Sequence, residues 1–278
     1  MPHSYVSVTI VKGTGALNID GTAYDTRLRQ LSEAISQEID RYTKHTFQPR
    51  TGTYFYSGDS TTLLLVNDLI ALSGGTFVED DNNDGTFDVN WAAADFFLLP
   101  RQADPTSEWG RPYTAIMVNP KSNGTQDEFL SGPDRYRLIG TFGYVSVTRD
   151  SGIDTSGTTG TGTTVTVNTL GVEPGWMILI EDERLYVQST GTGGTSLTVL
   201  RSQYNSTILN HATTLNVNYF VYPQAITEAA LIQTARLWQR RNSGFAQTVG
   251  IPEMGVITTF RGLDDDVKLL LNPYRKLL

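Results

Sequence analysis

The spacing of side-chain oxygens that most resembles a metal site places Asp80, Asn82 and Asp84 at alternating positions, directly before Gly85. This matches the first half of a calcium loop, in which oxygen ligands alternate and a glycine permits the sharp turn. The second half does not match, because the twelfth position is Trp91, where a bidentate glutamate is needed. Since Asp-Gly also favours a tight hairpin turn, we interpret the segment as a polar hairpin tip.

The other titratable clusters do not predict catalysis. Asp264 to Asp266 stand where acidic residues stabilise the first turn of a helix. His3, His45 and His211 lie in separate segments, without ligand-like spacing to one another or to a carboxylate. The glycine-rich run 157–162 lacks the Lys-Ser/Thr of a phosphate loop. We therefore predict no catalytic residues, no metal ligands and no cofactor.

One local concentration of basic residues is present. It comprises Arg236, Arg240 and Arg241, with Arg275 and Lys276 near the end of the sequence. Cations at the end of a helix are favourable in themselves, because they complement the helix dipole. The alternative is contact with a partner carboxylate or with DNA phosphate. The residue pattern leaves both interpretations open.

The composition is that of a globular protein. The 278 residues are 39% hydrophobic and 18% charged, and 29 acidic against 21 basic residues give a net charge of −8. This charge argues against a broad basic surface that wraps nucleic acid. The absence of cysteine excludes disulfides and thiolate sites. We expect no membrane span, since no apolar run approaches about 18 residues, and no signal peptide, since the N-terminus lacks a basic segment followed by an apolar one.

Three segments predict helices. Tyr222 to Gly244 has a start signal at Pro223 and a stop signal at Asn242 to Gly244, with two apolar edges and a basic stripe. Asp25 to Lys44 repeats apolar residues at helical spacing. A last short helix begins at Asp264 to Asp266 and ends before Pro273.

Short β-prone runs fill most of the remaining chain. Residues 5–11 alternate as a strand would, and residues 51–147 predict a small antiparallel sheet. Residues 151–164 are almost entirely Gly, Ser and Thr, which is typical of a flexible linker. The strands that follow suggest a β-barrel or sandwich inserted between this sheet and the Tyr222 helix.

These elements predict an α+β protein with a helical core, a small antiparallel sheet and an inserted all-β barrel or sandwich module. Residues 1–150 and 221–278 would form the core, and residues 151–220 the inserted module.

Several segments, and the order in which they follow one another, resemble the head-tail adaptor, or connector, proteins of tailed bacteriophages. The resemblance covers about residues 20–145 and 222–278. The segments that carry it are Ile39-Asp40-Arg41-Tyr42-Thr43, Asp95-Phe96-Phe97-Leu98-Leu99-Pro100, Gly140-Thr141-Phe142-Gly143-Tyr144, the helix from Ala229 to Arg241, and Leu263 to Val267 with Leu270 to Arg275. In simpler relatives the Phe-Gly-Tyr strand leads almost directly into the helix, which agrees with an insertion here. The insertion itself resembles a β module of several phage structural proteins, although Ser202 or Ser206 stands where that pattern has glycine.

The resemblance implies a structural, non-catalytic protein of the phage neck. Its partners would be further copies of itself in a ring, commonly of twelve, the portal protein above, a tail-side neck or tail-terminator protein below, and genomic DNA passing non-specifically through the channel during ejection. It would act in the virion, at the head-tail junction, after assembly in the host cytoplasm.

The family docks onto the portal through its C-terminal segment. Here the docking candidates are Leu263, Val267, Leu270, Tyr274, Arg275 and Lys276. Candidates for subunit or DNA-channel contact are Arg236, Arg240 and Arg241.

A second hypothesis belongs to another class. The β module would decorate the tail or neck and bind a host glycan or another virion protein, while the helices anchor it. A glycan site needs polar groups around exposed aromatics, for which the module offers Trp176, Tyr186 and Tyr204.

Overall fold

The fold is described from a computed structural model of residues 1–278, apart from positions 123, 125, 158–159, 161, 192, 242–247, 252–254, 259–261 and 277–278. The chain forms two compact units. Unit 1 comprises Met1–His45, Thr148–Gln203 and Thr207–Leu278, and unit 2 comprises Thr46–Val147 with Tyr204–Ser206.

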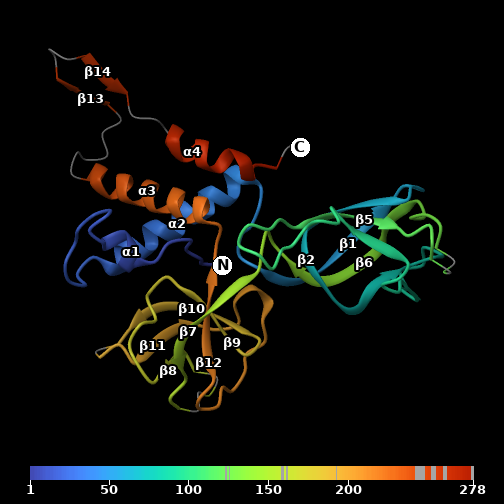
Figure 1. The fold of residues 1–278 in the computed structure, drawn as a ribbon, viewed down its shortest axis with the longest axis horizontal. Helices are drawn as coiled ribbons and strands as arrows, with labels where there is room; N and C mark the ends of the chain where they lie inside the picture. The colour runs from blue at the N-terminus through green and yellow to red at the C-terminus, as the bar shows by residue number, and fades with distance from the viewer. Residues whose placement is uncertain are drawn as a thin grey trace. The chain divides into compact units, whose positions relative to one another are not determined.

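Unit 2 is built on a six-stranded antiparallel sheet. Five strands lie in the order β1-β6-β2-β5-β4, and β3 pairs with β2. Figure 1 labels the central strands of this sheet. The bounds are β1 Arg50–Gly58, β2 Leu63–Glu79, β3 Val89–Asn90, β4 Phe96–Leu99, β5 Tyr113–Val118 and β6 Gly132–Phe142.

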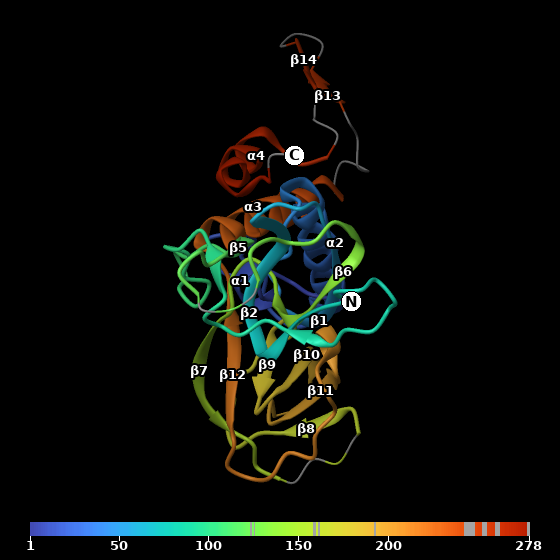
Figure 2. The same cartoon turned by 90° about the vertical axis from the view of Figure 1, so that its right-hand side faces the viewer.

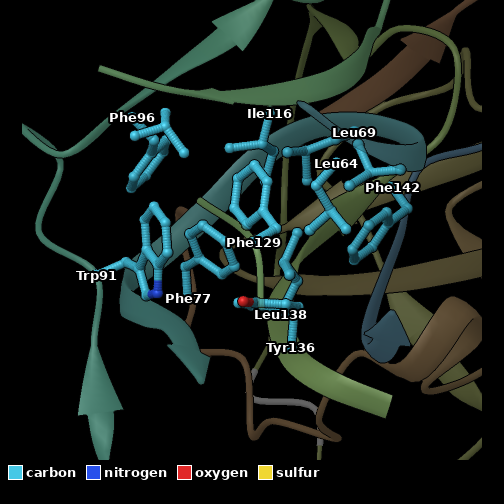
Figure 3. Packing of buried hydrophobic residues seen from close by; sticks show 12 residues of the cluster. Leu64, Leu69, Phe77, Trp91, Phe96, Ile116, Phe129, Tyr136, Leu138 and Phe142 are labelled. Carbon is cyan, nitrogen blue, oxygen red and sulfur yellow. The ribbon is translucent and has the colours of Figure 1, made fainter. Parts of the chain in front are cut away.

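An aromatic core covers one face of this sheet. Phe77, Trp91, Phe129 and Tyr136 are at most 2% exposed, and the Trp91 and Phe129 rings stack with centroids 5.0 Å apart. Figure 3 shows these rings beside the aliphatic side chains of the same cluster. The buried Glu79 carboxylate accepts hydrogen bonds from Trp91 Nε1 at 2.9 Å and from the Tyr136 hydroxyl at 2.8 Å. Unit 2 therefore has a complete core of its own.

Unit 1 contains four helices among the residues that the structure describes. They are α1 Val8–Lys12, α2 Asp25–Thr43, α3 Gln224–Arg240 and α4 Asp265–Leu271. Helix α2 packs against α3, as both views show (Figures 1 and 2). A short 3₁₀ turn, Asn272–Tyr274, follows α4, and strands β13 Thr248–Ile251 and β14 Gly255–Thr258 pair as a hairpin before it.

The second sheet, also in unit 1, has six strands in the order β7-β12-β9-β10-β11-β8. A bridge between Thr155 and Val167 joins the ends of its two edge strands, so the sheet curls toward a barrel. Figure 2 shows several of these strands side by side. The bounds are β7 Val147–Asp154, β8 Thr164–Thr166, β9 Met177–Ile180, β10 Glu183–Thr190, β11 Ser196–Leu200 and β12 Asn216–Val221.

A buried ionic cluster closes one end of this sheet. The fully buried Glu183 carboxylate accepts from Arg201 Nε at 2.7 Å and Nη2 at 2.6 Å, and from the backbone N–H groups of Ser202 and Leu209. His211 places Nε2 3.0 Å from Glu183 Oε2 and Nδ1 2.9 Å from Glu181 Oε2. Burial by itself raises the pKa of Glu183, but the hydrogen bonds from Arg201 and the backbone outweigh it and lower the pKa.

The predicted fold class is wrong, because the protein is mostly β and has no helical core with a small accessory sheet. The sequence interpretation split one 17-residue strand, β2, into two short runs at Asn67, a turn-forming residue. In the structure β2 continues through Asn67, with register shifts in its pairing at Leu65/Leu69 and Leu72/Phe77. Unit 2 is thus a full six-stranded sheet with its own core.

Two local predictions are also wrong. Residues 5–11 contain α1 instead of a strand, because the Ser7 side chain caps the helix by accepting from Ile10 N, and Val8 and Val11 are buried together. The expected linker 151–164 begins within β7, which runs to Asp154. Positions 158–159 and 161 of that linker lie outside the described residues.

The helix predictions are confirmed in type and place. Helix α2 covers the expected segment except Lys44, and α3 begins after Pro223. The expected α3 stop signal at 242–244 lies outside the described residues. Asp264 is the N-cap residue of α4, as the aspartate run predicts. The β-strands expected within residues 151–220 are present, as the end of β7, β8 to β11 and most of β12, whereas the domain boundaries at 150 and 221 stay a prediction.

Candidate docking surface on the C-terminal helices

The start of α4 is fixed by the side chain of a buried glutamine on α3. Gln233 is 1% exposed, and its Oε1 accepts from the backbone N–H of Asp264 at 3.1 Å. A buried amide satisfied in this way is costly to disturb, since its loss leaves a polar group unpaired. The junction between α3 and α4 is therefore specified by sequence, although the amphipathic pattern of α3 does not reveal it.

The basic stripe of α3 pairs with the aspartates at the start of α4. Asp264 accepts from Arg240 at 2.8 Å and from Arg236 at 3.1 Å, and Arg236 also forms a bidentate pair with Asp266. Pairing with Asp266 raises the pKa of Arg236, and pairing with Arg236 lowers the pKa of the Asp266 carboxyl. The aspartates thus serve both as helix-start residues and as the partners of the arginines.

Arg241 contacts aromatic rings of its own chain. Its guanidinium carbon lies 3.5 Å from the centre of the Trp238 ring and 5.0 Å from that of Tyr24. Cation–π contacts at exposed sites such as this one contribute about 0.5–1 kcal/mol. All three arginines that the sequence singles out for subunit or DNA contact are therefore engaged within the chain.

The six docking candidates divide into buried and accessible residues. Leu263 is 3% exposed and Val267 is 0% exposed, so both belong to the core of unit 1. Leu270 and Tyr274 are half-buried, and burial raises the pKa of the Tyr274 hydroxyl. Arg275 is exposed, and Lys276 is half-buried.

The last described residues lie against the end of α2. The exposed Arg275 places its guanidinium carbon 5.6 Å from the centre of the Tyr42 ring, and the Tyr42 hydroxyl donates to Asn272 Oδ1 at 2.7 Å. The backbone N–H of Lys276 donates to Thr43 O at 2.8 Å. These contacts hold the segment in one place on unit 1.

The sequence analysis missed Leu269. Its side chain is 71% exposed, which makes it the large apolar residue that α4 presents to solvent. The signal was available, because at about 100° per residue Leu269 lies on the opposite side of α4 from the buried Val267 and Leu271. Three consecutive leucines at 269–271 cannot all face one core.

The calcium-like segment forms the hairpin tip that its turn chemistry favours. The Asp80 carboxylate accepts from the backbone N–H groups of Asp84 at 3.0 Å and Gly85 at 2.7 Å, and Asp84 accepts from Thr86 N at 2.7 Å. The hydrogen bonds that the Asp84 carboxylate accepts from Thr86 lower the pKa of Asp84. In the described part of the chain, no group of three or more His, Asp or Glu residues is arranged to hold a metal ion.

Two histidines do have carboxylate neighbours that their sequence positions hide. His3 Nε2 lies 3.2 Å from Asp40 Oδ2, and His211 lies between Glu181 and Glu183. Both pairs join residues at least 28 positions apart, so spacing along the chain gives no signal for them. Both histidines are buried, and we interpret these contacts as structural.

The aromatic candidates for glycan binding are mostly internal. Tyr186 is fully buried and its hydroxyl donates to Glu33 Oε1 at 2.6 Å, while Tyr204 is 7% exposed. Trp176 is half-buried and stacks on Tyr219 with ring centroids 4.6 Å apart. Tyr186 and Tyr204 are therefore too buried to present an aromatic face to a sugar ring, and Tyr219 covers one face of Trp176.

Comparison with known proteins gave no match, either to a protein-family model or among curated proteins. None of the described helices is long and apolar enough to cross a membrane.

Proposed function

We propose that this protein is a structural head-tail adaptor of a tailed bacteriophage, which forms a ring beneath the portal and joins head to tail. The proposal starts from the ordered set of segments that resembles the adaptor family. It assigns no catalytic role to the chain. Its partners are the portal, a tail-side neck protein and further copies of itself.

The observation that carries the proposal in the structure is the C-terminal surface of unit 1. Leu269 is 71% exposed on a helix whose start is held by Gln233 and by the ion pairs of Asp264. Because these contacts hold the start of α4 in place, docking through this helix costs little backbone conformational entropy. Arg275 is exposed and fixed near Tyr42, and arginine is enriched at binding hot spots.

The arginines of α3 enter this proposal in a different role from the one that the sequence suggests. Because Arg236 and Arg240 pair with Asp264 and Asp266, they stabilise the docking segment and need not touch DNA. Reversing their charge would break these pairs, so it would disturb the fold of the segment as well as any contact.

The test uses substitutions of exposed residues. Deleting residues 263–278 is a poor test, because Val267 and Leu271 are fully buried and their loss would damage the core. We expect Leu269→Glu and Arg275→Glu to leave thermal unfolding unchanged and to reduce co-purification with portal oligomers at least tenfold. A matched control is Leu170→Glu, which alters another exposed leucine, 62% accessible. Portal binding at wild-type level by both L269E and R275E would refute this docking surface.

A further inference from the structure

Unit 2 contains a cavity of about 770 Å³ beside the aromatic end of its core. Phe77, Trp91 and Phe96 line it, and Figure 3 shows these three side chains near one another in the core cluster. Sites that bind small organic ligands usually have volumes of about 300–1,000 Å³. The cavity is therefore large enough for a small molecule.

Most of the accessible wall of this cavity is apolar. It is formed by half-buried side chains and by two small exposed ones, namely Leu72, Phe97, Leu98, Ala92 and Ala93. Each Å² of apolar surface that a ligand removes from water contributes about 25 cal/mol. The wall thus favours a ligand with an apolar body.

The polar side chains at the cavity are few. They are Arg101 and Tyr113 near the β4–β5 pair, and Asn90 on β3. Leu99, the last residue of β4, pairs with Ala115 of β5. Because Arg101 follows this pair by two residues and Tyr113 precedes it by two, both lie at the same end of the two strands.

The guanidinium of Arg101 lacks an anionic partner within the part of the chain that the structure describes. Its guanidinium carbon lies 4.0 Å from the centre of the Phe97 ring, and no described carboxylate pairs with it. The residues that line the cavity include no aspartate or glutamate. Guanidinium has five N–H donors and no acceptor, and its geometry matches a carboxylate. The cavity therefore combines an apolar wall with one uncompensated positive charge.

We propose that this cavity binds a small organic anion, with the apolar body of the ligand against Leu72, Phe97 and Leu98 and its carboxylate at Arg101. The hydroxyl of Tyr113 and the amide of Asn90 are further hydrogen-bond donors in the same cavity. A cationic ligand of the same shape would be repelled by Arg101. The cavity belongs to unit 2 and the docking surface to unit 1, so this inference goes beyond the proposed function and does not rest on it.

The first experiment compares two ligands that share an apolar chain and differ in charge. Decanoate and decylamine are titrated separately into the full-length protein by isothermal calorimetry, below the concentrations at which they form micelles. We expect decanoate to bind with one-to-one stoichiometry and decylamine to bind at least tenfold more weakly. Absence of decanoate binding, or equal binding of the two ligands, would overturn the inference.

The second experiment locates the binding by substitution. Arg101→Gln should weaken decanoate binding at least tenfold and leave decylamine binding no weaker, whereas Ala93→Trp should abolish binding of both by filling the cavity. The matched control is Arg111→Gln, at an exposed arginine that follows in the chain and does not line the cavity.

Each variant is first checked for wild-type thermal unfolding. If A93W does not fold, R101Q decides the question, because it alters an exposed side chain. Decanoate binding that is unchanged in R101Q, or equally weakened in R101Q and R111Q, would show that the anion is not held at this cavity.

Discussion

Replacing Glu183 by glutamine should destabilise the β-sheet of unit 1 more than any nearby substitution on its surface. Glu183 is fully buried, and the Arg201 side chain that donates two hydrogen bonds to it is 5% exposed. Removing one partner of a buried ion pair costs about 3–5 kcal/mol, because the other charge is left uncompensated. Since glutamine keeps one acceptor oxygen for the backbone N–H groups, we expect a loss of about 3 kcal/mol.

The assay is urea unfolding followed by far-UV circular dichroism, with hydrogen exchange of β9 and β10 as a local readout. Glu181→Gln is the matched control, because Glu181 contacts the same His211 but its side chain is 44% exposed. We expect that control to cost under about 1 kcal/mol. The double variant Glu183→Gln with Arg201→Met should lose less stability than the sum of the single losses, by about 1–3 kcal/mol.

The lowered pKa of Glu183 predicts the direction in which its contribution to stability changes with pH. The pKa of Glu183 is lowered in the folded state, so its stabilisation is present above the unfolded-state pKa, near 4.5, and is lost as the pH falls through the folded-state value. The stability difference between wild type and E183Q should therefore shrink below about pH 4.5. A difference smaller than about 1 kcal/mol at pH 7, or one that does not change on acidification, would refute the reasoning.

Three further substitutions test other parts of the structure. Tyr186→Phe removes a hydroxyl that donates to Glu33, so we expect the free energy of unfolding in urea to fall by about 1 kcal/mol. Because burial raises the pKa of Tyr186, the wild-type residue should stay un-ionised in an ultraviolet titration to about pH 11. Asp264→Asn should speed hydrogen exchange in α4 roughly tenfold, because Arg236 and Arg240 each lose their ion pair with Asp264; unchanged exchange would contradict the role of these ion pairs. Leu138→Ala should cost unit 2 about 3 kcal/mol in urea unfolding, since Leu138 is fully buried in the core, and a loss below about 1 kcal/mol would mean that the core is misassigned.

Helices were predictable where one periodicity ran over several turns. Leu28, Ile35 and Ile39 repeat at helical spacing and are buried in α2, and Pro223 marks the start of α3. Helix α1 was not predictable in the same way, because its five residues are β-branched in part and their alternation favours a strand. There a single capping hydrogen bond from Ile10 N to Ser7 Oγ, with burial of Val8 and Val11, decides the outcome.

Strand positions were predictable, but the extent of the sheet was not. The β-prone runs at 62–66 and 68–78 belong almost entirely to one strand, β2, whose register shifts cannot be inferred from one sequence. Long-range pairing joins β1 to β6, about 80 residues later, and no local pattern encodes that partner. The predicted fold class was wrong because the helices were taken as the core and the first sheet as a small accessory to it, whereas the structure has two six-stranded sheets.

The candidate site was predictable in composition and not in pairing. The basic residues of α3 and the aspartates at the start of α4 were both recognised, but their ion pairs depend on how two helices pack. The exposed Leu269 follows from helical geometry alone, whereas the partnership of His211 with Glu183 depends on the path of the loop that precedes it.

Electron cryo-microscopy of the protein mixed with its portal tests the central proposal most directly. We predict a closed ring coaxial with the portal, with Leu269 and Arg275 at the contact between the two proteins. Failure to bind the portal, or attachment as separate copies on the outside of the portal without a ring, would contradict the assignment as a head-tail adaptor.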